Sequence, residues 1–259
     1  MSAETTASLR DNLLLEALRG PDRDAIRPHL KAIFPPKGTV LFEAGEAVTH
    51  LTFPCRHAVV TLLITTRDGR SAETATIGHE GAVGCVVGHG LLPASTSAVV
   101  QIAGPMLRIE SQILQEVKRR SAPIRDLFAR YADCLLAQVL QASACNALHP
   151  IEQRCLRWLL TLHDRIGSAS LPITHELLAA MLGVQRTYLT RVLSSVQDQG
   201  LITVGRGHIV VRDRARMEAA ACECHGRVRQ HYETVLGAVY TAAGIDHLDV
   251  AAKASADVE

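Results

Sequence analysis

Residues 182–202, LGVQRTYLTRVLSSVQDQGLI, decide the fold because they separate into two faces when they are placed on a helix. One face is apolar at helical spacing, with Leu189, Val192, Leu193 and Val196. The other face is polar and carries Arg186, Thr187, Thr190, Arg191 and Ser194. The pattern predicts a short helix that docks on a domain through its apolar side and leaves two arginines on its open side.

The residues before this helix complete a helix-turn-helix pattern. Thr174 followed by an apolar run is typical of a helix start, because its hydroxyl can accept a hydrogen bond from a free backbone N–H. Ala179 is small where two helices would nearly touch, and Gly183 lies where the turn requires a left-handed backbone. Apolar residues stand at the offsets that dock the second helix: Leu178, Leu182, Val184, Leu189 and Val192.

The segment GLITVGRGHIVVRD (200–213) predicts two short strands around Gly205-Arg206-Gly207, a hairpin of the kind called a wing. An arginine on the helix can donate a bidentate pair to a guanine edge, which is worth about 1–3 kcal/mol of discrimination. Hydroxyls, the tyrosine and the basic wing tip suit contacts with bases or phosphates. The candidate DNA-binding residues are Gln185, Arg186, Thr187, Tyr188, Thr190, Arg191, Ser194, Arg206 and His208. The alternative is a helical pair that closes a small domain, with arginines that only keep it soluble.

Charge and composition agree with a DNA-binding protein of two domains. The 259 residues have a net charge of +1, but residues 150–216 carry nine basic and five acidic side chains. A local excess of this kind is expected where a protein contacts a polyanion. A hydrophobic content of 47% excludes a largely disordered chain. Because there is neither a secretory signal pattern nor an apolar run of about 18–20 residues, we expect a cytoplasmic protein.

The first half of the chain predicts short helices and then a β domain. Residues 8–31 suggest two short helices, and residues 38–110 hold six short β-rich runs punctuated by turn residues. Many short strands at this spacing predict an antiparallel β-barrel or jelly roll. Residues 111–120 suggest a short helix, and a long one begins at Pro123.

The long helix has no charged residue between Asp133 and His149, and it is apolar nearly all round. Such a helix must be buried on several sides, so we expect one side on the β domain and another in a dimer interface. The interface residues predicted from 3/4 spacing are Ile124, Phe128, Tyr131, Leu135, Val139 and Ala142. A core helix of a monomer is the alternative. A membrane span would need a longer run without Gln138, Gln141, Ser143 and Asn146.

A β-barrel, a long helix and a winged helix-turn-helix in this order resemble the Crp/Fnr family of bacterial transcription regulators. The similarity runs from about residue 25 to residue 213 and is strongest over ITHELLAAMLGVQRTYLTRVLSSVQDQGLITVGRGHIVV (173–211). The resemblance implies an α+β fold with a cyclic-nucleotide-binding-like β-barrel and a homodimer on a pseudo-palindromic operator. It implies half-sites about 34 Å apart and, for an activator, contact with RNA polymerase. The domains expected are 1–120 (sensor), 121–149 (dimerisation helix), 150–213 (winged helix-turn-helix) and 214–259 (helical extension and tail).

Two departures from the family pattern limit what the resemblance implies. The best-known half-site is read with a glutamate after the first recognition arginine, where this chain has Thr187, so we expect a different operator. The glutamate and arginine that bind cAMP in the family correspond to Cys85 and Thr96, which supply neither the carboxylate nor the positive charge. We therefore expect no cAMP binding, no cofactor and an unidentified effector. The candidate pocket residues are Gly84, Cys85, Thr96 and Ser97.

The sequence patterns that would indicate a metal site or an enzyme are weaker than the helix-turn-helix pattern. Seven scattered cysteines, of which Cys55 is the first, do not predict an iron–sulfur cluster or a disulfide framework. Cys222-Glu223-Cys224-His225 holds three soft ligands, but no second pair follows at a recognisable spacing, so no metal is predicted. The functional alternatives are a metal-dependent cupin enzyme and a dimeric protein-interaction scaffold. The histidines of the β region are His50, His57, His79 and His89, and they do not form the His-x-His pair of cupins. No catalytic residue is predicted.

Overall fold

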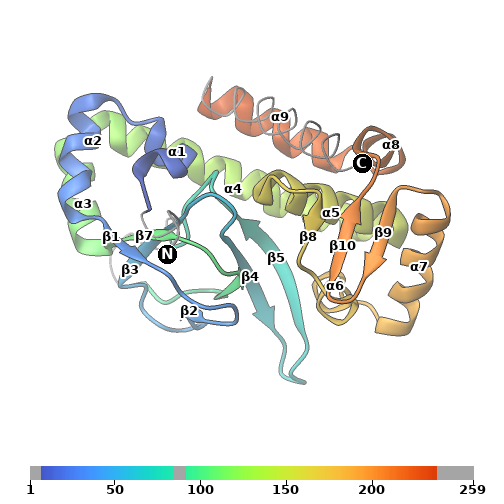
Figure 1. Cartoon of the computed structure of the whole chain (residues 1–259). Helices are drawn as coiled ribbons and strands as arrows, with labels where there is room; N and C mark the ends of the chain where they lie inside the picture. Colours follow the sequence, from blue (N-terminus) through green and yellow to red (C-terminus); the bar gives the residue numbers. More distant parts are fainter. Residues whose placement is uncertain (1–6, 85–91, 238–259) are drawn as a thin grey trace, which may run out of the picture.

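The protein, seen as a computed structural model, is described over residues 7–84 and 92–237, and Figure 1 shows two domains joined by one long helix. Cys85 and His89 lie outside the described residues. The chain begins with short helical segments in the region where two helices were predicted: η1 (Leu9–Asp11), α1 (Leu13–Glu16), α2 (Gly20–Ile26) and η2 (Arg27–His29). Asn12 fixes α1, because its side chain accepts from the Leu15 N–H and donates to the carbonyl oxygens of Pro54 and Gly81.

The N-terminal domain contains two antiparallel sheets, which are compatible with a jelly roll. The first has the order β1 (Lys31–Ile33), β7 (Met106–Glu110) and β3 (His50–Pro54). The second has the order β2 (Val40–Phe42), β6 (Ser97–Ile102), β4 (Val59–Thr65) and β5 (Ser71–Ile77). The two sheets do not close into the predicted barrel. Strand β1 was not predicted, because two of its three residues are exposed and give no alternating pattern.

Helix α3 (Ser111–Arg120) leads into α4 (Ala122–Leu148), and both match the predicted ranges within one or two residues. The Ser121 hydroxyl caps α4 by accepting from the Ile124 N–H over 3.2 Å. Most of the predicted dimer face is buried within the single chain. Ile124, Phe128, Tyr131 and Leu135 are at most 7% exposed, and Val139 and Ala142 are half-buried. The four buried residues pack in apolar clusters with the N-terminal domain, so they offer little surface to a second copy.

The C-terminal domain consists of α5 (Ile151–Ile166), β8 (Ser170–Leu171), α6 (His175–Leu182), α7 (Arg186–Asp198), β9 (Ile202–Gly205) and β10 (His208–Val211). Its sheet has the order β8-β10-β9, and the sequence analysis did not predict β8. The core contains Leu156, Leu159 and Leu162 of α5, and Val59 and Ile102 of the N-terminal domain join the same apolar cluster. The two domains therefore share part of a core.

Two further helices, α8 (Arg214–Ala220) and α9 (Cys224–Leu236), follow the wing. Helix α9 lies along α4 and runs antiparallel to it (Figure 1), since Cys224 contacts Gln141 whereas Val235 contacts Arg130. With the sheets on one side and α9 on another, α4 keeps two large exposed apolar residues in its middle, Leu136 (55% exposed) and Leu140 (61% exposed). Within the described ranges, no helix has the length and apolarity that crossing a bilayer needs.

Candidate nucleic-acid interface

The turn between α6 and α7 has the geometry that the sequence predicts. Thr174 Oγ1 accepts a hydrogen bond from the Leu177 N–H over 3.2 Å, and this contact starts α6. Gly183 ends α6 in the left-handed region, with φ 67° and ψ 34°, which a residue with a Cβ adopts at a cost. The Val184 N–H then donates to the carbonyl oxygen of Ala179 over 3.0 Å. Ala179 is 3% exposed, as expected for a small residue between two helices.

Helix α7 presents its polar face to solvent. Its apolar residues are at most 7% exposed: Leu189, Val192, Leu193 and Val196. All nine candidate DNA-binding residues are exposed, Tyr188 by 48%. Among the described residues, no acidic side chain forms an ion pair with Arg186, Arg191 or Arg206. Their guanidinium donors are therefore available to a ligand.

The hydroxyl groups of α7 are partly used within the helix. The Thr190 hydroxyl donates to the carbonyl oxygen of Arg186, and the Ser194 hydroxyl donates to that of Thr190, each over 3.0 Å. In this arrangement both oxygens face outward as hydrogen-bond acceptors. His175, which the sequence analysis did not single out, lies beside them, with its Nδ1 3.3 Å from Thr190 Oγ1. Burial and the nearby Arg186 lower the pKa of His175, so this imidazole favours its neutral form.

The wing is held against α7 by side-chain contacts. The Gln197 side-chain oxygen accepts from the Val204 N–H over 2.8 Å, which ties β9 to the last turn of α7. At the tip, Gly207 has a φ of 81° and lets the hairpin turn. The His208 ring packs over Gly205, where a Cβ would lie 2.3 Å from it, so a side chain at this position would displace the ring. Arg206 is exposed at the wing tip, and the Gln197 contact links the wing to α7.

Two of the four predicted effector residues have contacts in the described part of the chain. The Ser97 hydroxyl donates to Glu43 over 2.5 Å and also accepts from the Ala44 N–H. A Cβ on Gly84 would meet Val48 at 2.9 Å. Apart from these residues, a cavity of about 150 Å³ lies between β5, α4, α5 and α9, and its lining includes Glu73, Gln138, Arg157 and Asp164.

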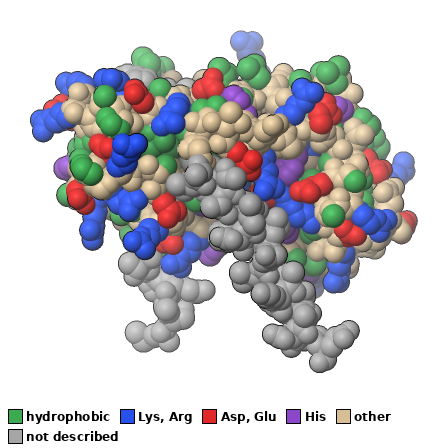
Figure 2. Space-filling view, turned by 90° about the horizontal axis from the view of Figure 1, so that it is seen from above, with side chains coloured by type: hydrophobic (Ala, Val, Ile, Leu, Met, Phe, Trp, Pro, Cys, Tyr) green, Lys and Arg blue, Asp and Glu red, His purple; other side chains and the backbone are tan. Residues whose placement is uncertain are grey.

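Charge on the face that holds α9 is mixed. Figure 2 shows lysine and arginine side chains interspersed with acidic ones over both domains in this view. This face therefore offers no continuous basic surface for a polyanion. The arginines on α7 and at the wing tip are exposed.

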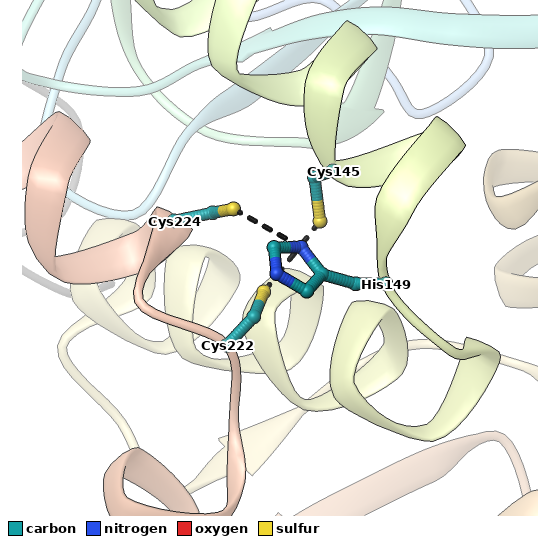
Figure 3. Close-up of side chains that lie close together, drawn as sticks. All are labelled: Cys145, His149, Cys222 and Cys224. Carbon is teal, nitrogen blue, oxygen red and sulfur yellow. Dashed lines mark hydrogen bonds between the residues drawn. The ribbon is translucent and has the colours of Figure 1, made fainter.

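One cluster of side chains escaped the sequence analysis. Cys145 and His149 at the end of α4 meet Cys222 and Cys224 near the start of α9 (Figure 3). The signal was a cysteine and a histidine four positions apart on a helix, 73 positions before the Cys-x-Cys pair. In the described residues no comparable group of ligands gathers in the β-sheets, where a cupin would hold its metal.

The fold and this interface define a class: a protein with a double-sheet domain, one long connecting helix and a winged helix-turn-helix. Comparison with known families agrees, because the family model of the Crp-like helix-turn-helix domain matches residues 153–220. The chain thus has the fold of the Crp/Fnr transcription regulators and carries their helix-turn-helix domain, and the resemblance seen in the sequence is confirmed.

Solved structures support the fold over most of the chain. A putative transcriptional regulator of the Crp/Fnr family from Eubacterium rectale matches with 21% identity and a TM-score of 0.60, over 80% of this chain and 96% of that one. FixK2 from Bradyrhizobium japonicum matches with 15% identity and a TM-score of 0.65, over 74% and 98%. The c-di-GMP responsive regulator CLP from Xanthomonas campestris matches with 18% identity and a TM-score of 0.60, over 74% and 99%. No curated protein sequence matches this chain.

Proposed function

We propose that this protein regulates transcription by inserting α7 into the major groove of a specific DNA site. The single observation that carries the proposal is the division of α7: Leu189 and Leu193 are fully buried, while Arg186 and Arg191 are exposed and have no acidic partner. Two exposed arginines five residues apart, about 1.4 turns of the helix, can each reach a base edge. Water solvates these two guanidinium groups in the free protein, and a phosphate-lined groove would offer both of them countercharge.

The remaining polar residues support this role by position. The acceptor oxygens of Thr190 and Ser194 suit the amino groups of adenine or cytosine. Gln185 and Thr187 lie at the start of α7, and Tyr188 extends from its first turn. Arg206 and His208 stand on the wing, where contacts with the phosphate backbone would set the register of the protein on DNA. We assign base reading to α7 and backbone contact to the wing.

The functional unit in this proposal is a homodimer. The exposed Leu136 and Leu140 lie one turn apart in the middle of α4, and exposed small residues continue the same stripe at Ala129, Ser143 and Ala147. Pairing of two α4 helices through this stripe would bury it and would place two α7 helices on one duplex. The operator would then have two related half-sites, about one helical turn apart.

The proposal extends to the kind of signal that the protein senses and to its effect on transcription. The residues that stand where the family binds cAMP lack the needed charges, so we propose that cAMP is not the effector. A signal would act by shifting the placement of the two DNA-binding domains about α4. We propose that the protein has no catalytic activity and acts in the cytoplasm, where such a regulator reaches chromosomal DNA. Where it activates a gene, we propose that it contacts RNA polymerase.

Selection of bound fragments from random duplex DNA tests the proposal directly. The expected result is an enriched motif with two related half-sites, bound with an affinity that falls steeply as salt rises. An unenriched pool at modest ionic strength would contradict sequence reading by α7. Binding that hardly responds to salt would point to the scaffold alternative, since a packed protein interface lacks counterion release.

A further inference from the structure

Three cysteines and one histidine from distant parts of the chain meet where α4 ends. Cys145 and His149 lie one turn apart, Cys222 precedes α9, and Cys224 is the first residue of α9. Figure 3 shows the four side chains pointing toward one another from α4 and from the start of α9. Their potential ligand atoms all lie within 4.8 Å of one another. The three cysteines are at most 6% exposed, and the His149 side chain is 20% exposed.

The separations in the cluster fit a single small ion. Sγ of Cys145 lies 3.5 Å from Sγ of Cys222, and Sγ of Cys224 lies 3.5 Å from Nδ1 of His149. Zinc bonds of about 2.3 Å to sulfur and about 2.0–2.1 Å to nitrogen put tetrahedral sulfurs about 3.8 Å apart and a sulfur and a nitrogen about 3.6 Å apart. Both measured pairs agree closely with these values. The widest pair allowed by the 4.8 Å limit would have to close by about 1 Å.

The groups around the cluster are those that support metal ligands. Gln141 Nε2 donates a hydrogen bond to Cys224 Sγ over 3.1 Å, a contact that stabilises negative charge on sulfur. His149 turns its other ring nitrogen, Nε2, to the Glu223 carboxylate at 3.5 Å. A carboxylate in this place fixes the tautomer and the orientation of a metal-bound histidine. Cysteines that only fill space are surrounded differently, as Cys55 and Cys155 lie within large apolar clusters.

We propose that Cys145, His149, Cys222 and Cys224 bind one Zn²⁺ ion in a tetrahedral site. Thiolate and imidazole ligands in tetrahedral arrangement select zinc over the oxygen-preferring ions. Four protein ligands leave no open coordination position, which is the mark of a structural rather than a catalytic zinc. The evidence for this site is the arrangement of the four ligands, and this evidence does not depend on DNA binding.

The position of the site gives the ion a mechanical role. His149 is the C-cap of α4 and Pro150 the N-cap of α5, so the ligand lies at the junction between the long helix and the DNA-binding domain. The ion would fasten the start of α9 to this junction, while Tyr232 and Leu236 hold the other end of α9 through apolar contacts. Occupancy of the site would therefore limit how α5 can turn relative to α4.

Metal analysis of the full-length protein tests the site. Protein purified under reducing conditions with Zn²⁺ should hold one zinc per chain, and Cys222→Ala and His149→Ala should each reduce zinc to background. Cys55→Ala, which removes a buried thiol outside the cluster, is the matched control and should keep one zinc per chain. Replacement by Co²⁺ should give the absorption of a tetrahedral thiolate site in the wild type and lose it in Cys222→Ala.

A second variant protects the test against misfolding. The Glu223 side chain is 55% exposed, so Glu223→Gln should fold normally yet weaken zinc binding about 10–100-fold in competition with a chelator. Equal zinc content in the wild type and Cys222→Ala would overturn the proposal. Several irons per chain with acid-labile sulfide, or a Cys145–Cys222 disulfide in the reduced preparation, would overturn it as well. All these measurements are made without DNA. A negative result would therefore overturn the zinc site and leave the proposed DNA binding untouched.

Discussion

Arg165 on α5 donates from Nε to a carboxylate oxygen of Glu80 over 2.8 Å, and this ion pair joins the DNA-binding domain to the end of β5. The two side chains are 8% and 15% exposed. Gln138 of α4 completes the junction, since it accepts from Arg165 over 3.3 Å and donates to the carbonyl oxygen of Thr76. Burial tends to raise the pKa of Glu80, but Arg165, His79 and the Gly78 N–H outweigh it and hold this pKa below its usual value. The carboxylate is thus charged at neutral pH.

Replacing Glu80 should therefore destabilise the fold strongly. Glu80→Gln removes the hydrogen-bonded countercharge of the buried Arg165 guanidinium and leaves the more weakly coupled Glu73, which costs up to about 3–5 kcal/mol of the free energy of unfolding. Urea denaturation followed by circular dichroism measures the loss. Glu116→Gln is the matched control, because Glu116 pairs with Arg119 and Arg120 on an exposed helix face, where the cost is at most about 1 kcal/mol. Equal losses in the two variants would show that the domain junction does not depend on this pair.

His163 should make the stability depend on pH. Its Nδ1 accepts a hydrogen bond from Arg214 over 2.7 Å, which only the neutral imidazole can do. Burial and then the charge of Arg214 lower the pKa of His163. Below about pH 6.5 the imidazole of His163 is protonated in the unfolded chain but stays neutral in the folded chain. Its contribution to the free energy of unfolding is therefore complete above that pH, and it is lost as the pH falls toward the folded-state pKa.

The prediction is a loss of unfolding free energy between pH 7.5 and 5.5, with a slope of at most about 1.4 kcal/mol per pH unit from this group. His163→Gln should flatten the curve in that window, whereas His57→Gln, on the exposed surface, should leave it unchanged. Parallel curves for the wild type and His163→Gln would contradict a neutral, buried His163.

Local sequence signals were sufficient for most of this fold. The cap at Thr174, the left-handed Gly183 and the buried stripe of α7 depend on neighbours within a few residues, and each is found where the sequence predicts it. The start of α4 also follows from local chemistry, since the hydroxyl of Ser121 accepts from the Ile124 N–H. The short β1 and β8 were missed, because strands of two or three residues have no periodicity to detect.

Contacts between segments far apart in the chain could not be predicted from local sequence patterns. Helix α4 has apolar residues on nearly every side, so periodicity cannot say which stripe meets the sheets, which meets α9 and which stays exposed. The predicted stripe through Phe128 and Leu135 proved to be the inner one. The cysteine cluster was missed for the same reason, since only the antiparallel course of α9 along α4 brings Cys224 to Cys145.

Leu140 offers a test of the proposed dimer. Leu140→Glu would place two carboxylates near the axis between paired α4 helices, which should cost about 3 kcal/mol and raise the dimer dissociation constant about a hundredfold. Sedimentation at micromolar concentration should show a dimer for the wild type and a monomer for the variant. Ile64→Glu, at an exposed apolar residue of β4, is the control and should remain dimeric. A wild-type protein that sediments as a monomer would contradict pairing through α4.

Arg186 and Arg206 should fail in different ways when each is changed to alanine. Arg186→Ala removes a proposed bidentate contact with a base, so binding to the selected operator should weaken by about 1–3 kcal/mol while binding to random duplex changes little. Arg206→Ala removes a proposed phosphate contact at the wing tip, so both affinities should fall alike and the salt slope should drop by about one. Arg119 lies on α3, at the opposite end of the molecule from α7 (Figure 1), and Arg119→Ala should change neither quantity. Titrations of labelled duplexes at several salt concentrations distinguish these outcomes, and equal losses on operator and random DNA for Arg186→Ala would remove base reading from that residue.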